Sequence, residues 1–236
     1  MSGPMRIAVW MGGDTSEREI SLKTGQAVVA ALTEGGHDVR TVVLGDPFAA
    51  LAAGATREAD VVFVALHGGA GEDGRIQAML ELAGLPYVGS GPGASAVAMD
   101  KSWTKRIARD LGLPTAEWAD VMPHDDAGTV KSMADALGGP LVLKPANEGS
   151  AVGVHLLDGP ADVPGALTEI GPRARPWMLE RYVAGRELTV PLLWGEAFPL
   201  IEIRPKAGFY DYTNKYTAGR TEYDCPADLP HDVAGR

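Results

Sequence analysis

Short apolar segments that alternate with helical segments are the feature that most limits how this chain can fold. Residues 6–11, 39–44 and 61–66 are apolar, Val-rich runs of strand length. Apolar residues recur at helical spacing near residues 20–32 and 76–83. Strands that alternate with helices form parallel βαβ units. We therefore expect the first part of the chain to be a parallel sheet with helices packed on it.

The first predicted helix has a start and a stop in the sequence. Ser16 and Glu19 match the S-x-x-E pattern of a capping box, and Gly35-Gly36 is expected to end the helix. The residues predicted to form its apolar face are Ile20, Ala27, Val28, Ala31 and Leu32.

A second mixed segment follows Pro114, which ends a longer predicted helix. The apolar residues of that helix are spaced by four, at Met99, Trp103, Ile107 and Leu111. Further strands are expected near 117–121, 141–144 and 152–157, and helices near 130–137 and 163–170. From Trp177 the runs are strand-like, with a hairpin turn at Gly195 and a polar, tyrosine-rich loop at 205–224.

The charge and composition exclude several classes of function. The net charge of −10 disfavours nucleic acids and anionic membranes, because both require clustered Lys and Arg. No apolar run approaches membrane-spanning length, and the N-terminus lacks the layout of a signal peptide. Cys225 is the single cysteine, so a reducing compartment is expected. The sequence predicts a cytoplasmic protein and leaves open a small anionic ligand.

The segment LVLKPANEGSAVGVHLL, residues 141–157, carries the sharpest chemical signal. Lys144 ends an apolar strand, and a Gly149-Ser150 turn follows. A lysine at such a place is costly to bury unless it meets an anion, and the N–H groups of a glycine-serine turn can bind one. A plain hairpin with an exposed lysine explains the residues equally well. From the residues alone, both interpretations stay open.

Other candidate residues are less specific. His67 follows a buried-type strand, at the edge where open α/β sheets bind ligands. Lys101 and Lys105 lie one helical turn apart, and a solvated helix face explains them as well. Glu180 and Glu187 bracket a strand and a turn and are better explained as surface carboxylates. The glycine fingerprints of dinucleotide-binding and P-loop proteins are absent from the sequence.

Several longer motifs occur in an order that is typical of a known family. They are MGGDTSEREISLKTG, ALHGGAGEDGRIQAMLELAGLPYVGSG, AMDK, LKPANEGSAVGV, LERYVAGRELTV and FYDYTNKYTAGRTEYDCPA. In this order they closely resemble the D-alanine–D-alanine ligases of the ATP-grasp superfamily, over nearly the whole chain from Met5. The resemblance implies an α/β fold of ATP-grasp type. Its implied parts are an N-terminal Rossmann-like parallel-sheet domain at 1–93, a central α+β ATP-binding subdomain at 94–185, and the start of a C-terminal subdomain at 186–236, including a mobile loop at 205–224.

The resemblance also implies a reaction. The carboxylate of one D-alanine attacks the γ-phosphate of ATP to form an acyl phosphate, and the amine of a second D-alanine then attacks the carbonyl and releases phosphate. The implied substrates and cofactors are D-alanine, ATP and Mg²⁺, and the implied setting is peptidoglycan precursor synthesis by a cytoplasmic homodimer. Such chemistry requires cations on the phosphates and exclusion of water.

The nucleotide-binding residues implied by the resemblance lie in three places. Lys101 and Lys144 resemble the lysines that bind the α- and β-phosphates, and Glu187 resembles the ribose ligand. The loop that closes over the triphosphate consists of Glu148, Gly149, Ser150 and Ala151. The strand that binds adenine, chiefly through backbone groups of 181 and 183, consists of Glu180, Arg181, Tyr182 and Val183.

The resemblance implies further residues on the substrate side. Glu17 resembles the carboxylate that receives the ammonium of the first D-alanine, rather than a helix-dipole acid. His67 resembles the histidine beside the first substrate and the intermediate. Ser150 and Tyr216 resemble a pair that hydrogen-bonds with Glu17 and latches the mobile loop, and Lys215 resembles the loop lysine that reaches the γ-phosphate. The tyrosine in this loop is typical of ligases that make a dipeptide rather than a depsipeptide.

The chain departs from the family pattern at three places. Ala151 stands where many relatives carry a second serine, and Gly69 where an arginine is often found. The family continues beyond the last motif with a catalytic arginine and the ligands of magnesium, and Asp224 and Asp228 do not match that context. We expect no metal ligand in this sequence. A fragment of a longer enzyme, a chain that binds nucleotide poorly and a chain completed by a partner all remain open.

Three other functions remain as alternatives. They are a related dipeptide ligase of antibiotic biosynthesis or resistance, a non-catalytic binding module, and a nucleotide-dependent oxidoreductase, which the missing glycine fingerprint disfavours. ATP-dependent phosphate release with a series of amino acids distinguishes the two ligases. If the folded chain binds neither ATP nor D-alanine in calorimetry, the non-catalytic binding module is favoured.

Overall fold

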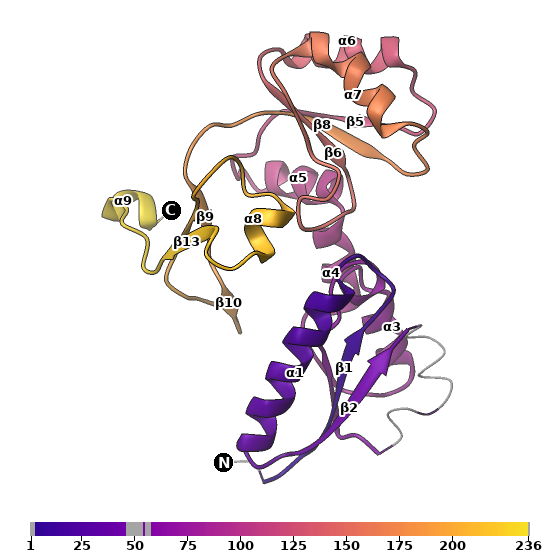
Figure 1. Cartoon of the computed structure of the whole chain (residues 1–236), viewed down its shortest axis with the longest axis vertical. Helices are drawn as coiled ribbons and strands as arrows, with labels where there is room; N and C mark the ends of the chain where they lie inside the picture. The colour runs from indigo at the N-terminus through magenta and orange to yellow at the C-terminus, as the bar shows by residue number, and fades with distance from the viewer. Residues whose placement is uncertain (1–2, 46–53, 55–57, 236) are drawn as a thin grey trace. The chain divides into compact units, whose positions relative to one another are not determined.

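The computed structural model describes residues 3–45, 54 and 58–235, which divide into two compact units (Figure 1). Unit 1 ends at Pro114 and unit 2 begins at Thr115. The predicted boundary between residues 93 and 94 falls inside unit 1, and the one between 185 and 186 falls inside unit 2. The three-part division therefore remains a prediction.

Unit 1 is built on a parallel sheet, as predicted, and the sheet has a fourth strand, β4, that was not predicted. Its order is β2-β1-β3-β4, with β1 at Arg6–Gly12, β2 at Asp38–Leu44, β3 at Val61–Val64 and β4 at Tyr87–Val88. The register aligns Ile7 of β1 with Val39 of β2 and Val61 of β3. The residues of β1 from Ile7 onward are buried, because the strand is central in the sheet and its side chains point to faces that helices cover.

Helices cover both faces of this sheet. The helical elements of unit 1 are α1 (Arg18–Glu34), the short 3₁₀ helix η1 (Gly69–Gly71), α3 (Arg75–Leu82), α4 (Pro92–Met99) and α5 (Lys101–Asp110). Figure 1 shows α1 alongside β1 and β2. One apolar cluster joins α1 to Val9 and Met11, and a second joins α3 to Trp10 through Ile76 and Leu80. The alternation of side chains along β1 thus supplies both cores.

The start and the buried face of α1 differ from the prediction. No capping box forms: the N-cap residue is Glu17, and its side chain makes no capping hydrogen bond. The helix buries Ser21 and Gly25, whereas Ala27 is exposed. A Cβ atom at Gly25 would lie 2.6 Å from the Cβ of Met11. Close approach of the helix to β1 therefore selects small residues, which an apolar pattern does not reveal.

The longer helix predicted through Met99 is two helices. Asp100 separates α4 from α5 and caps α5, because its carboxylate accepts hydrogen bonds from the N–H groups of Ser102 at 2.9 Å and Trp103 at 3.1 Å. The apolar residues spaced by four along α5 are exposed, whereas Lys105 is buried. The solvated-face interpretation is therefore wrong for Lys105.

The larger sheet of unit 2 is antiparallel, in the order β5-β8-β6-β7. Its strands are β5 (Trp118–Val121), β6 (Leu141–Pro145), β7 (His155–Leu157) and β8 (Trp177–Arg181). The helices α6 (Ala127–Leu137) and α7 (Val163–Ile170) lie side by side over it, with the 3₁₀ turn η2 (Pro160–Asp162) between β7 and α7 (Figure 1). Val121, Val130, Leu143, Val163 and Leu179 belong to their shared core.

A smaller sheet completes unit 2, in the order β13-β12-β9. It consists of β9 (Glu187–Thr189), β12 (Ile201–Pro205) and β13 (Thr221–Asp224), and the short helix α9 (His231–Ala234) follows. The predicted turn at Gly195 is confirmed by the hairpin of β10 (Leu192–Leu193) and β11 (Glu196–Ala197). The segment 205–224 is not all loop, since it contains α8 (Tyr212–Tyr216) and β13. Within the described ranges, no helix is long and apolar enough to span a bilayer.

Candidate functional site

Glu17 is held at the carboxyl edge of the parallel sheet in unit 1. Its side chain is buried, and its backbone N–H donates to the hydroxyl of Thr15 at 3.2 Å. That hydroxyl donates in turn to the carbonyl oxygen of His67 at 2.9 Å. A Cβ atom at Gly68 would lie 2.7 Å from Oε2 of Glu17. The turn after β1 and the glycine turn after β3 therefore meet, and they bring Glu17 close to the His67 backbone.

His67 lies in a polar group that the sequence only partly revealed. Its Nε2 atom is 3.0 Å from the hydroxyl of Thr24, and its Nδ1 atom is 3.6 Å from Oε1 of Glu72. A pocket of about 370 Å³ is lined by His67, Thr24, Glu72 and Gln77 together with small residues of α4. Sequence reasoning missed Thr24 and Glu72, although Glu72 belongs to the same HGGAGEDG motif as His67.

Lys101 also belongs to unit 1, as the first residue of α5. It is partly buried, and Lys105, one turn later, is buried. Unit 2 holds Lys144 and all the remaining predicted site residues. The predicted contacts between Glu17 and the residues of unit 2 therefore remain predictions.

Lys144 and Glu180 form an ion pair inside the larger sheet of unit 2. They lie on the neighbouring strands β6 and β8, two register positions apart. Nζ of Lys144 donates to Oε1 of Glu180, and the side chains are only 19% and 15% exposed. The interpretation of both as ordinary surface charges is therefore wrong. An ammonium has three donors, so Lys144 retains capacity for a second anion beside Glu180.

The segment 141–157 is a hairpin, but its lysine is largely buried rather than exposed, and anion binding by its turn remains a prediction. Strands β6 and β7 pair antiparallel, with Leu141 opposite Leu157. Between them, Ser150 and Ala151 adopt φ angles of +51° and +57°. Left-handed conformations in residues other than glycine cost about 1–2 kcal/mol each and are characteristic of functional loops. Glu148 in the same loop forms an ion pair with Arg175, which sequence reasoning missed.

Two residues of α8 contact the glycine-rich loop. The hydroxyl oxygens of Tyr216 and Ser150 are 2.9 Å apart, and Nζ of Lys215 donates to Oγ of Ser150 at 3.1 Å. The Lys215 ammonium also lies 5.4 Å from the ring centroid of Tyr216, within range of a cation–π contact. The resemblance selected Ser150, Lys215 and Tyr216, and Lys215 is 65 residues from Ser150 in sequence. The three residues meet at the hydroxyl of Ser150.

The predicted adenine and ribose segment begins in strand β8 of the larger sheet and continues beyond it. The N–H groups of Arg181 and Tyr182 donate to the carbonyl oxygens of Glu117 and Pro140, each at 2.9 Å. Val183 lies beyond β8 with its side chain exposed. Glu187 is exposed, although nearby protein atoms desolvate its carboxylate enough to raise its pKa.

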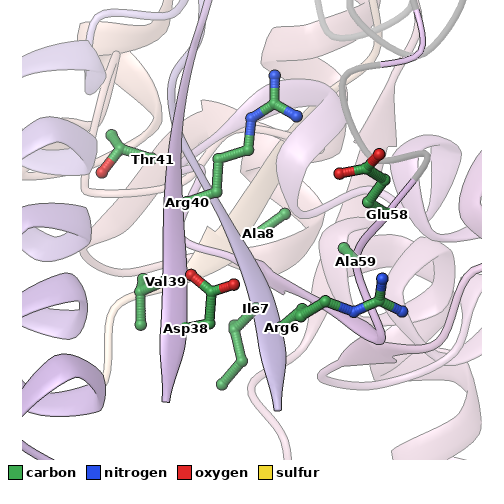
Figure 2. Close-up of a pocket in the computed structure, with 9 residues that line it drawn as sticks. All are labelled: Arg6, Ile7, Ala8, Asp38, Val39, Arg40, Thr41, Glu58 and Ala59. Atoms are coloured by element: carbon green, nitrogen blue, oxygen red, sulfur yellow. The ribbon is translucent and has the colours of Figure 1, made fainter. Parts of the chain in front are cut away.

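A second pocket, of about 480 Å³, lies at the opposite edge of the parallel sheet in unit 1. Figure 2 shows Arg6 and Asp38 at the amino ends of β1 and β2, with Arg40 and Glu58 around the opening. Arg6 is paired with Asp60 at 2.7 Å. The pocket contains none of the predicted site residues, and ligands of parallel sheets bind at the carboxyl edge instead.

The described part of the chain does not provide a magnesium site. None of its His, Cys, Asp and Glu side chains gather in groups of three or more that could hold a metal ion. Asp224 accepts a hydrogen bond from Nε of Arg204 at 2.7 Å, and this bond lowers the pKa of the carboxyl. It therefore forms an ion pair with Arg204.

Comparisons with known proteins agree with these features. Residues 107–236 match the family described as "D-ala D-ala ligase C-terminus", and residues 44–90 match "D-ala D-ala ligase N-terminus". The D-alanine–D-alanine ligase of Anaeromyxobacter sp. (strain K) is 47% identical over 225 residues, which are 95% of this chain and 72% of that protein. The ligase of Aquifex aeolicus is 43% identical over 93% of this chain and 73% of its own length.

A solved structure also matches the whole chain. The D-alanine–D-alanine ligase of Bacillus anthracis, crystallised in complex with ATP, aligns with a TM-score of 0.83 and 32% identity. The alignment covers 100% of this chain and 75% of that structure. The predicted ATP-grasp fold is therefore confirmed.

Proposed function

The chain belongs to the D-alanine–D-alanine ligase family, and we propose that its own residues bind ATP and the first D-alanine for an ATP-dependent ligation. The observation that carries this proposal is the convergence of Lys215 and Tyr216 on Ser150, above a hairpin that also holds Lys144. A loop that folds back onto a glycine-rich turn beside a buried lysine is suited to enclose a phosphate chain.

The proposed first step is an attack on ATP. The carboxylate oxygen of the first D-alanine forms a bond to the γ-phosphorus, the bond to the bridging oxygen of ADP breaks, and ADP leaves with that electron pair. Lys144 and Lys215 stabilise the negative charge of the phosphate oxygens as donors. Glu17 receives the ammonium of the first D-alanine, so that the carboxylate of that amino acid remains free to react.

The proposed second step joins the two amino acids. The neutral amine of the second D-alanine attacks the carbonyl carbon of the acyl phosphate, the bond from that carbon to the phosphate oxygen breaks, and inorganic phosphate leaves with the electron pair and takes up the proton that the nitrogen loses. The closed loops around Ser150 exclude water, which would otherwise hydrolyse the acyl phosphate. The described residues do not fit magnesium, because their His, Cys, Asp and Glu side chains do not gather in groups of three or more. No step is therefore assigned to a metal ion here.

Nucleotide affinity of the full chain tests the proposal. Lys144→Ala should weaken ATP binding about tenfold or more, because it removes a charged donor from a largely buried site. Lys131→Ala is the matched control, since Lys131 is an exposed lysine paired with Asp135 on α6. Equal affinity of the two variants in isothermal titration calorimetry would refute the phosphate-binding role.

The choice of substrate is tested separately. We expect ATP-dependent phosphate release to require D-alanine, with the dipeptide as product, because Tyr216 is present in the loop. Release with D-serine or D-lactate but not with D-alanine would instead support a ligase of antibiotic biosynthesis or resistance. A cytoplasmic location and a homodimer are further proposals from the same family membership, and cell fractionation and analytical ultracentrifugation test them.

A further inference from the structure

We propose that Asn214 is a positioning residue that holds Lys215 and Tyr216 against Ser150. The inference concerns a residue between the helix cap Asp211 and the two loop residues that contact Ser150. It rests on the proposed function for the role of Lys215 toward phosphate, but not for the existence of the contact itself.

Asn214 is buried in a segment whose neighbours are exposed. Asn214 is only 7% exposed, whereas Thr213 and Lys215 on either side are exposed. A buried amide is costly unless its donors find partners. Nδ2 of Asn214 donates to the carbonyl oxygens of Ala207 at 3.0 Å and Phe209 at 2.7 Å. Both donors are therefore used to close the loop on itself.

The backbone of Asn214 adds two more connections. Its N–H group donates to Oδ1 of Asp211 at 2.8 Å, and its carbonyl oxygen accepts from the hydroxyl of Thr221 at 2.6 Å. Thr221 begins β13 and pairs with Pro205 of β12. Asn214 thus joins the beginning of the loop, the helix and the returning strand, and it fixes all three to the smaller sheet.

We call the hydrogen bonds of Asn214 to Ala207, Phe209, Asp211 and Thr221 the clamp. The clamp determines where the side chains of Lys215 and Tyr216 point. Helix α8 has only five residues, which is too short to be stable without tertiary contacts. With Asn214 directed inward, Lys215 reaches Ser150 at 3.1 Å and the Tyr216 hydroxyl lies 2.9 Å from it. Loss of the amide donors would free the helix to rotate or unwind, and both contacts would be lost together.

Hydrogen–deuterium exchange tests the clamp without any ligand. In Asn214→Ala, amide exchange across residues 205–224 should accelerate about tenfold or more, because the carbonyl groups of Ala207 and Phe209 lose the donor that closes the loop. Thr213→Ala, at the exposed neighbour in the same helix, should leave exchange unchanged. Equal exchange in wild type and Asn214→Ala would overturn the inference.

Two further measurements keep the inference testable if Asn214→Ala does not fold. Asn214→Asp retains the shape but places a carboxylate against two carbonyl oxygens, so its loop should exchange at least as fast as that of the alanine variant. In the unaltered chain, the side-chain amide protons of Asn214 should exchange slowly by NMR. Rapid exchange of those protons would contradict the clamp directly.

The affinities for ATP and ADP separate positioning from a general structural role. If Asn214 orients Lys215 toward the γ-phosphate, Asn214→Ala should weaken ATP binding about tenfold and change ADP binding little. Lys215→Ala should do the same, and the double variant should lose no more than either single variant. Equal losses for ATP and ADP would overturn the positioning role.

The same experiments distinguish failure of the inference from failure of the proposed function. An unaltered chain that binds neither nucleotide would refute the proposed function, while the exchange data would still report on the clamp. An unaltered chain that binds ATP, together with an Asn214→Ala variant of unchanged exchange, would refute only the clamp.

Discussion

The glycine turns of unit 1 and the glycine-rich loop of unit 2 position their side chains by different physical means. In unit 1, close backbone packing places Glu17: Gly68 leaves no room for a Cβ atom beside the carboxylate, and Gly25 lets α1 approach β1. In unit 2, polar side chains perform this role, since Lys144 pairs with Glu180 and Lys215 donates to Ser150.

The difference shows which half can move without unfolding. Steric packing is set when the unit folds, and moving Glu17 would require separating buried backbone segments. The contacts at Ser150 are a few hydrogen bonds from an exposed segment, each of which contributes about 1 kcal/mol. The glycine turns therefore hold Glu17 in a fixed place within unit 1, whereas the contacts at Ser150 within unit 2 can break without unfolding that unit.

Gly68→Ala should break the fixed arrangement around Glu17 with the largest effect. Gly68 has φ +68° and ψ 168°, a region that is essentially limited to glycine, and the new Cβ would lie 2.7 Å from Oε2 of Glu17. We expect a loss of about 2–4 kcal/mol in the free energy of unfolding of unit 1. Chemical denaturation measures it.

Gly84→Ala provides the matched control for this change. Gly84 also has φ +68°, but a Cβ atom there meets nothing within 4 Å. Its loss should be about 1 kcal/mol, from backbone strain alone. Equal losses at the two glycines would show that the contact with Glu17 contributes nothing.

Glu180→Gln should have the next largest effect, in unit 2. It leaves the Lys144 ammonium in a site that is 19% exposed without its charged partner, which should cost about 1–3 kcal/mol in unfolding free energy. Asp135→Asn, which breaks the exposed pair with Lys131, should cost less than about 0.5 kcal/mol. A similar loss in both variants would show that burial of the Lys144 pair has no consequence.

Ala151→Gly should have a smaller effect of the opposite sign. Ala151 has φ +57°, so glycine removes the strain of the left-handed conformation and offsets its own greater freedom in the unfolded chain. We expect the free energy of unfolding, measured by thermal unfolding, to increase by about 0.5–1 kcal/mol. The contrast is Ala166→Gly in α7, which should lose about 1 kcal/mol; a loss in both variants would exclude strain in the loop.

Asp60→Asn should have the smallest effect and tests whether charge pairs matter in unit 1. Hydrogen bonds from Arg6 lower the pKa of Asp60 from 3.8 to about 2. A lowered carboxyl pKa stabilises the fold above the unfolded value, and this contribution is lost as pH falls from about 4 to about 2. The melting temperatures of the variant and the unaltered chain should differ slightly at neutral pH and converge near pH 2. A constant difference would contradict the pairing.

Much of the fold could be predicted because its signals are local. The first three strands of unit 1, the hairpin at Gly195 and the β6–β7 hairpin follow from residue type and turn chemistry. The break at Asp100 escaped prediction because apolar spacing continues across it, while a single carboxylate caps the second helix. Strand β13 was not predicted, because α8 separates it in sequence from its partner strand β12.

The candidate site was predictable only where a motif carried it. The resemblance selected Ser150, Lys215 and Tyr216, and the structure brings them together. It gave no weight to Arg175 or Asn214, which bind their partners through contacts that no short motif encodes. Polar residues in loops are ordinarily assigned to the surface, and only the burial of Asn214 in the folded chain shows otherwise.

The sequence by itself determined the three longer strands of unit 1, the hairpin turn at Gly195 and the family, because these depend on residue type and on spacing along the chain. Tertiary structure alone decided that α1 packs through Ser21 and Gly25, that Lys144 pairs with Glu180, and that Asn214 faces inward. The physical reason is that burial and pairing depend on residues that are distant in sequence and adjacent only after folding. A lysine or an asparagine acquires its role from those neighbours.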